Sequence, residues 1–146
     1  MLTKYVSGVT VRDASHECFE FESGQKAWID IEITAARKVK DLTVILELKN
    51  DRNYEILNVN TQRLGYGTIN LEPGEKFSVS FELDLHLVPG NYHVGVLVYR
   101  ASVTKIYDQC FPAAMIFVGC DQDLKGAANL YPKVEMRKLV PDGMPA

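Results

Sequence analysis

The chain has 146 residues, of which 47% are apolar, and its formal net charge is −3. This length can bury one hydrophobic core but is too short for two ordinary domains. Because no basic run is present, we expect neither nucleic acid nor an anionic membrane surface as a partner. The first eight residues lack the apolar segment of a signal peptide, and no apolar run is long enough to cross a bilayer. We therefore expect a soluble, cytoplasmic protein.

Alternation of apolar and polar side chains recurs along the chain and predicts short strands. The predicted strands cover residues 4–11, 27–33, 42–49, 54–58, 77–84, 92–100, 113–118 and 130–136. Residues that favour turns, such as Ser23-Gly24, Pro73-Gly74 and Pro89-Gly90, separate nearly all of these segments. Strands at this spacing, with almost no helical periodicity, predict an all-β sandwich or barrel.

The strand after Pro89-Gly90 carries the clearest signal. One of its faces is apolar and predicts a core position for Val94, Val96 and Val98. Its other face is mixed and carries His93, Gly95, Leu97 and Tyr99. This mixed face is one place where a binding function could lie.

The last predicted strand, residues 130–136, contains Pro132, which cannot donate a hydrogen bond to a ladder. We therefore expect this strand at a sheet edge, or broken at the proline. The sequence predicts one domain over residues 1–136 and a mobile tail over residues 137–146, which is rich in proline and glycine.

Several kinds of chemistry are not expected from the sequence. It has no glycine-rich phosphate loop and no nucleophile elbow, so by itself it should neither bind a nucleotide nor act as a hydrolase of that class. The histidines have no metal-ligand spacing, so we expect no metal and no cofactor; they are His16, His86 and His93. The cysteines are odd in number and lack a CxxC spacing, which argues against disulfides and for a reducing compartment; they are Cys18, Cys110 and Cys120.

Trp28 is the sharpest candidate for ligand binding. Alternation places Ile29, Ile31 and Ile33 in the core, so Trp28, Asp30 and Glu32 point outward. An outward tryptophan exposes a large apolar plane unless a chain segment covers it or a ligand stacks on it. We expect Ser78 and Ser80 beside the indole, where their hydroxyls could bond a sugar. Asp30 and Glu32 also have the spacing of a glycosidase carboxylate pair, although outward carboxylates are ordinary on a solvated sheet face.

A second candidate cluster consists of His93, Tyr99 and Arg100. His93 and Tyr99 share one strand face, and Arg100 at the strand end could hold an anionic group. Tyr54, Arg63 and Tyr66 add aromatic and cationic groups in a nearby loop. The alternatives are a solvated strand end, or a protein interface around the outward Ile45 and Leu97.

Several short sequence motifs, or marks, follow one another in a characteristic order along the chain. They are Phe21-Glu-Ser-Gly-Gln25, Asn58-Val-Asn-Thr61, Leu71-Glu-Pro-Gly74, Pro89-Gly-Asn-Tyr92, Tyr107-Asp108, Phe117-Val118, and Gly126 with Leu130. In this order the chain resembles, over about residues 6–136, the C-terminal carbohydrate-binding domain of the Wzt-type ATPase subunit of O-antigen polysaccharide ABC transporters.

The resemblance implies an immunoglobulin-like antiparallel β-sandwich of two sheets. It implies a non-catalytic module that recognises the terminus of a lipid-linked O-antigen polysaccharide and couples chain completion to export at the cytoplasmic face of the inner membrane. Its further partners would be the nucleotide-binding domain of the same polypeptide, the transporter's membrane subunit, and a second copy in a homodimer, in some members through the last strand. It transfers no site residues. The alternative is an immunoglobulin-like interaction or dimerisation domain without glycan binding.

Overall fold

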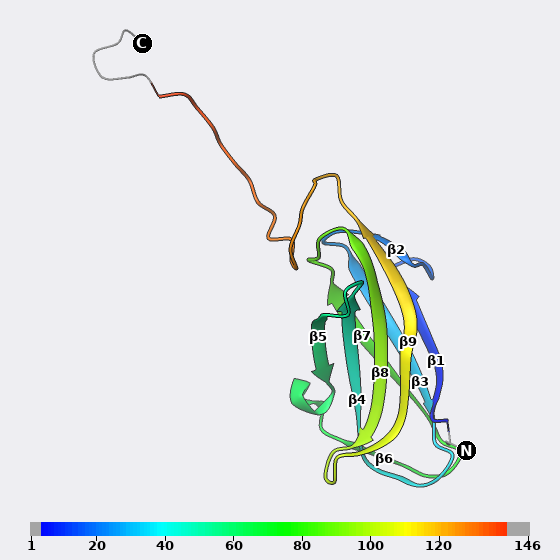
Figure 1. Ribbon diagram of the computed structural model, residues 1–146. Helices are drawn as coiled ribbons and strands as arrows, with labels where there is room; N and C mark the ends of the chain where they lie inside the picture. Colours follow the sequence, from blue (N-terminus) through cyan, green and yellow to red (C-terminus); the bar gives the residue numbers. More distant parts are fainter. Residues whose placement is uncertain (1–3, 140–146) are drawn as a thin grey trace.

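The computed structural model describes residues 4–139, and they form a sandwich of two β-sheets (Figure 1). The smaller sheet has the strand order β1 (Val6–Arg12), β3 (Lys26–Thr34), β7 (Lys76–Asp84). The larger sheet has the order β2 (Glu20–Glu22), β9 (Lys105–Gly119), β8 (Gly90–Arg100), β4 (Val39–Asn50), β5 (Glu55–Asn60), and β6 (Ile69–Leu71) also pairs with β4. All pairings are antiparallel except that of β2 with β9. The predicted two-sheet antiparallel sandwich is confirmed.

Most predicted strands form, with their ends moved by a few residues. The strands β2 and β6 were not predicted, because three residues are too short to show alternation. The strand predicted over residues 130–136 is wrong: this segment forms no strand and leaves the sandwich (Figure 1). Pro132 has no backbone N–H to donate to a neighbouring strand, and the side chain of Met136 is 84% exposed. The tail beyond residue 139 lies outside the described residues.

The core lies between the two sheets, where alternation predicted it. Ile29, Ile31 and Ile33 of β3 are fully buried, as are Val94, Val96 and Val98 of β8. Burying side chains of this size contributes about 1.5–3 kcal/mol each to the free energy of unfolding. The inward residues of β3 and β8 therefore contribute strongly to the stability of the sandwich. The outward residues of these two strands lie on the outer faces of the two sheets, where a binding site could form.

The turn before β8 is locked by a buried tyrosine. The hydroxyl of Tyr92 donates to the carbonyl oxygen of Val88 at 2.6 Å. Burial, together with the charge of Asp51, raises the pKa of Tyr92. A tyrosine that bonds back to backbone a few residues upstream is typical of immunoglobulin-like sandwiches, and it gives the Pro89-Gly-Asn-Tyr92 mark a physical reason.

One lateral edge of the sandwich is open. Within residues 4–139, the strand β7 pairs with β3 alone, and a cavity of about 450 Å³ lies between β7 and β4. The helical segment η1 (Gln62–Tyr66) follows β5 and lines this cavity with Leu64 and Tyr66. Within residues 4–139, no helix is long and apolar enough to span a membrane.

Candidate functional site

The outer face of the smaller sheet is centred on Trp28 of β3. Its direct cross-strand partners are Arg12 on β1 and Glu82 on β7. The Arg12 guanidinium lies 5.1 Å from the centre of the indole ring and covers part of it. The prediction that Ser78 and Ser80 directly flank Trp28 is wrong. Alternation assigns a residue to a face, whereas the β3–β7 register decides its partner, and that register places the two serines opposite Glu32 and Asp30.

The polar groups of this face bond one another. Arg12 Nε donates to Asp30 Oδ2 at 2.6 Å, and Ser80 Oγ donates to Asp30 Oδ1 at 2.6 Å. Partial burial alone would raise the pKa of Asp30, but the hydrogen bonds from Arg12 and Ser80 and the Arg12 charge together hold that pKa below its usual value. We define these residues, Arg12, Trp28, Asp30 and Ser80, as the Trp28 face.

Asp30 and Glu32 are held by different partners. Glu32 Oε1 accepts a hydrogen bond from Ser7 Oγ at 3.0 Å and lies 3.6 Å from Lys76 Nζ. Each carboxylate is thus engaged with its own neighbours across the strands. This is the arrangement of a solvated sheet face, and it gives no support to a glycosidase pair.

The second predicted cluster is divided by the structure. His93 and Tyr99 do share the outer face of β8, but they are six residues apart, or about 20 Å. Arg100 lies at the far end of the strand, where its Nε is 3.3 Å from Ser102 Oγ and 3.9 Å from Asp41 Oδ2. The three residues therefore do not form one site.

Around His93, the structure assembles a site that sequence reasoning missed. Three residues of β9, from Phe111 to Ala113, bulge opposite Gly95, and the Phe111 ring lies across that glycine. A Cβ at position 95 would come within 2.6 Å of the ring, so only glycine permits this contact. Phe111 is 40% exposed. A glycine inside an alternating strand was the available signal, since it often marks a close approach of another group.

Polar side chains surround the exposed ring. Lys49 Nζ lies 4.9 Å from the centre of the Phe111 ring, and the His93 ring centre lies 6.3 Å away. Glu47 lies beside Gly95, its cross-strand partner on β4. We define these five residues, Glu47, Lys49, His93, Gly95 and Phe111, as the Phe111 platform.

The charged and imidazole groups of the platform differ from those of the Trp28 face in their partners. In the part of the chain from residue 4 to residue 139, the side chains of Glu47, Lys49 and His93 make no hydrogen bond and no ion pair. Arg63, from η1, approaches the same face, where its Nη2 donates to Asn58 Oδ1 at 2.8 Å. Tyr54 and Tyr66, also named from the sequence, are exposed before and after β5 and do not join the platform.

The family model of the Wzt C-terminal domain matches residues 5–130. The chain belongs to the Wzt C-terminal domain family. The family resemblance inferred from the ordered sequence marks is thereby confirmed. Wzt C-terminal domains are parts of ABC-transporter subunits, and no curated protein sequence matches this one.

Solved structures agree on the fold of this Wzt C-terminal domain. A crystal structure of the C-terminal domain of Wzt is similar to it, with a TM-score of 0.79, 12% identity, and coverage of 90% of this chain and 83% of that one. A Bacteroides uniformis beta-glucuronidase has a TM-score of 0.52 at 16% identity, over 71% of this chain and 12% of the enzyme. The CARDB domain of the PF1109 protein from Pyrococcus furiosus has a TM-score of 0.50 at 10% identity, over 81% of this chain and 97% of that domain.

Proposed function

We propose that this Wzt C-terminal domain is a non-catalytic module that binds the terminus of a lipid-linked O-antigen polysaccharide and couples chain completion to export by an ABC transporter. Its partners would be a nucleotide-binding domain of the same polypeptide and the transporter's membrane subunit, at the cytoplasmic face of the inner membrane. The observation that carries the proposal is the Phe111 platform, an exposed aromatic ring with an ammonium, an imidazole and a carboxylate group around it.

The platform has the chemistry that sugar binding needs. An aromatic ring stacks on the C–H surface of a sugar, and carboxylate, ammonium and imidazole groups bond its hydroxyls. Glu47, Lys49 and His93 supply these groups around Phe111. Because the platform is an open strand face, we expect weak binding, with a Kd on the order of 0.01 to 1 mM.

Calorimetry with two oligosaccharides tests the proposal. One is a fragment that carries the completed terminus of the cognate polysaccharide, and the other is an internal repeat of equal length. We expect the terminal fragment to bind and the internal repeat to bind at least about tenfold more weakly, a difference of about 1.4 kcal/mol. Equal affinity for both fragments would contradict recognition of the terminus, and no binding of either would contradict the glycan function itself.

Two phenylalanine variants locate the site. Phe111→Ala should weaken binding of the terminal fragment about tenfold or more, because it removes the stacking surface. Phe117→Ala is the matched control, since Phe117 lies on the same strand, is 47% exposed and is outside the platform. Equal losses in the two variants would contradict a site at Phe111.

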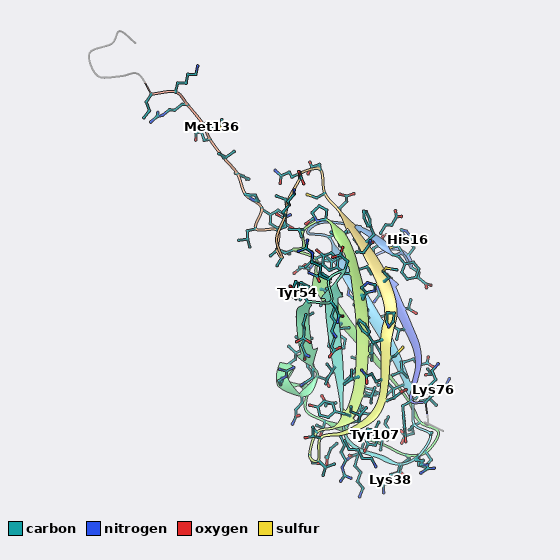
Figure 2. All side chains as sticks on the ribbon, viewed as in Figure 1. His16, Lys38, Tyr54, Lys76, Tyr107 and Met136 are labelled. Carbon is teal, nitrogen blue, oxygen red and sulfur yellow. The ribbon has the colours of Figure 1, made fainter. Side chains whose placement is uncertain are left out.

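We further propose that the domain forms a homodimer through residues 130–139. This segment leaves the sandwich with Leu130, Val134 and Met136 exposed by 84–85%, and Figure 2 labels Met136 on it. Among the described residues, one edge of β7 has no paired strand, and a cavity lies beside it, which an extended segment of a second copy could fill. Ile45 and Leu97, the interface suggested by the sequence, face each other across β4 and β8 and are half-buried.

Light scattering tests the dimer. The double variant Val134→Asp and Met136→Asp should be monomeric, because it places charges on the apolar side of the segment. Val103→Asp, at an exposed valine in the β8–β9 turn, should remain dimeric and serves as the control. A double variant that stays dimeric would contradict this interface.

A further inference from the structure

The connection between β1 and β2 is a tight, hydrogen-bonded turn. The N–H of Asp13 donates to the carbonyl oxygen of His16 at 3.0 Å, and the N–H of Cys18 donates to that of Val11 at 3.1 Å. Asp13 Oδ1 also accepts the backbone N–H groups of Ser15 and His16, at 2.7 and 2.8 Å. These hydrogen bonds therefore fix the backbone positions from which the side chains of Asp13, His16 and Cys18 extend.

Three different metal-ligating groups meet on this turn. One carboxylate oxygen of Asp13, one imidazole nitrogen of His16 and Cys18 Sγ all lie within 4.8 Å of one another. Asp13 Oδ1 is 3.3 Å from His16 Nδ1. In a tetrahedral zinc site with Zn–N and Zn–O bonds of about 2.0–2.2 Å, two such ligand atoms are about 3.3–3.6 Å apart. The Asp13 oxygen and the His16 nitrogen already have that separation, and the Cys18 sulfur lies within 4.8 Å of both residues' ligand atoms.

We propose that Asp13, His16 and Cys18 form a binding site for Zn²⁺, with a solvent molecule as the fourth ligand. The mixture of thiolate, imidazole and carboxylate suits a borderline-soft ion such as Zn²⁺, whereas Mg²⁺ and Ca²⁺ prefer oxygen ligands alone. The turn leads from β1 in the smaller sheet to β2 in the larger one, and all three ligands belong to it, so the ion would stiffen this connection.

Binding of Zn²⁺ at this site has to displace a proton. Partial burial and the Asp13 charge raise the pKa of Cys18, so the free protein carries a thiol. Hydrogen bonds from the backbone N–H groups of His16 and Ser15 lower the pKa of Asp13, which stays a carboxylate. Zn²⁺ binding would convert the Cys18 thiol to a thiolate and release its proton to solvent.

The spacing of Asp13, His16 and Cys18 in the sequence does not predict a metal site. Asp-x-x-His-x-Cys is not one of the common zinc patterns, and the three histidines are far apart in the sequence. The site depends on the turn, which folds Asp13 back toward His16. The proposed site is accessible to solvent, because the side chain of His16 is 69% exposed (Figure 2).

Titration of the reduced full chain with Co²⁺, a spectroscopic substitute for Zn²⁺, tests the site. We expect one equivalent of Co²⁺ to give a thiolate-to-cobalt absorption band that Zn²⁺ removes. Cys18→Ser should abolish the band, and His16→Gln should weaken Co²⁺ binding by about tenfold or more, since even supporting residues of metal sites have effects of that size. Circular dichroism would verify that both variants fold.

Cys120→Ser is the matched control. Cys120 Sγ lies 3.7 Å from Asp121 Oδ1, so it is also a thiol beside a carboxylate, and neither of the two is part of the proposed site. This variant should keep the band and the affinity. Absence of a saturable band in the wild type, or an unchanged band in Cys18→Ser, would overturn the proposal.

Discussion

The Trp28 face and the Phe111 platform place similar groups on opposite sides of the sandwich. In each, a cation lies about as far from the aromatic ring: 5.1 Å for Arg12 and Trp28, and 4.9 Å for Lys49 and Phe111. They differ in the state of the polar groups around the ring. On the Trp28 face, Arg12, Asp30 and Ser80 bond one another, whereas within residues 4–139 the polar side chains of the Phe111 platform have no such partners.

The difference shows what makes an outward aromatic ring a binding site. A ligand at Trp28 would have to compete with hydrogen bonds that the protein already makes, and breaking them costs free energy. A ligand at Phe111 would displace water and the Lys49 ammonium over the ring, but it would break no hydrogen bond made by the described polar side chains of the platform. The Trp28 face is therefore a stabilising network, and the Phe111 platform is the better candidate for recognition.

The largest expected effect comes from filling the space beneath the Phe111 ring. In Gly95→Val, the new side chain would push the ring off β8, since even a Cβ would lie 2.6 Å from it. We expect a destabilisation of about 1–3 kcal/mol from overpacking, and loss of glycan binding. Thermal unfolding and calorimetry measure the two effects. Unchanged stability and binding would show that neither depends on the contact between the Phe111 ring and Gly95.

Removing the carboxylate at the centre of the Trp28 face should affect stability and leave binding intact. Asp30→Ala takes away both hydrogen bonds and leaves Arg12 without its partner. Because the pair is partly exposed to solvent, we expect a loss of about 1–2 kcal/mol in urea unfolding. A large loss of glycan affinity in this variant would reverse the roles assigned to the two faces.

Acid should weaken the Trp28 face selectively. The pKa of Asp30 is lower in the folded state than in the unfolded state, so its contribution to stability is present above the unfolded pKa of about 3.9 and is lost as the pH falls through the folded value. In Asp30→Asn, the unfolding free energy should therefore fall less steeply with acid below about pH 4 than in the wild type. Parallel curves would contradict the depressed pKa.

The smallest expected effect is at Lys49. Replacing it by Gln removes one charged hydrogen-bond donor beside Phe111, and we expect the terminal glycan fragment to bind about threefold to tenfold more weakly. Stability should be unchanged within about 0.5 kcal/mol, as for most surface substitutions. Calorimetry with Lys26→Gln as the control, a lysine paired with Asp84 away from the platform, separates this effect from a general change of charge.

Alternation along β3 and β8 was enough to predict the core and the outward position of Trp28. It could not predict that Glu82 faces Trp28, because a period of two assigns a face and leaves the register open. The bulge at Phe111 interrupts the alternation of β9, so the platform could not be predicted from that strand. The alternation in residues 130–136 was recognised, but the described part of this chain offers it no paired strand.

Chemical-shift mapping by NMR distinguishes glycan binding at the Phe111 platform from binding at the Trp28 face, because both faces are observed in one titration. The terminal glycan fragment is added to the labelled full chain, and the amide shifts of the Phe111 platform and the Trp28 face are compared. We expect saturable shifts around Gly95 and His93, with no change around Trp28 and Asp30. Shifts confined to the Trp28 face would contradict binding at the Phe111 platform.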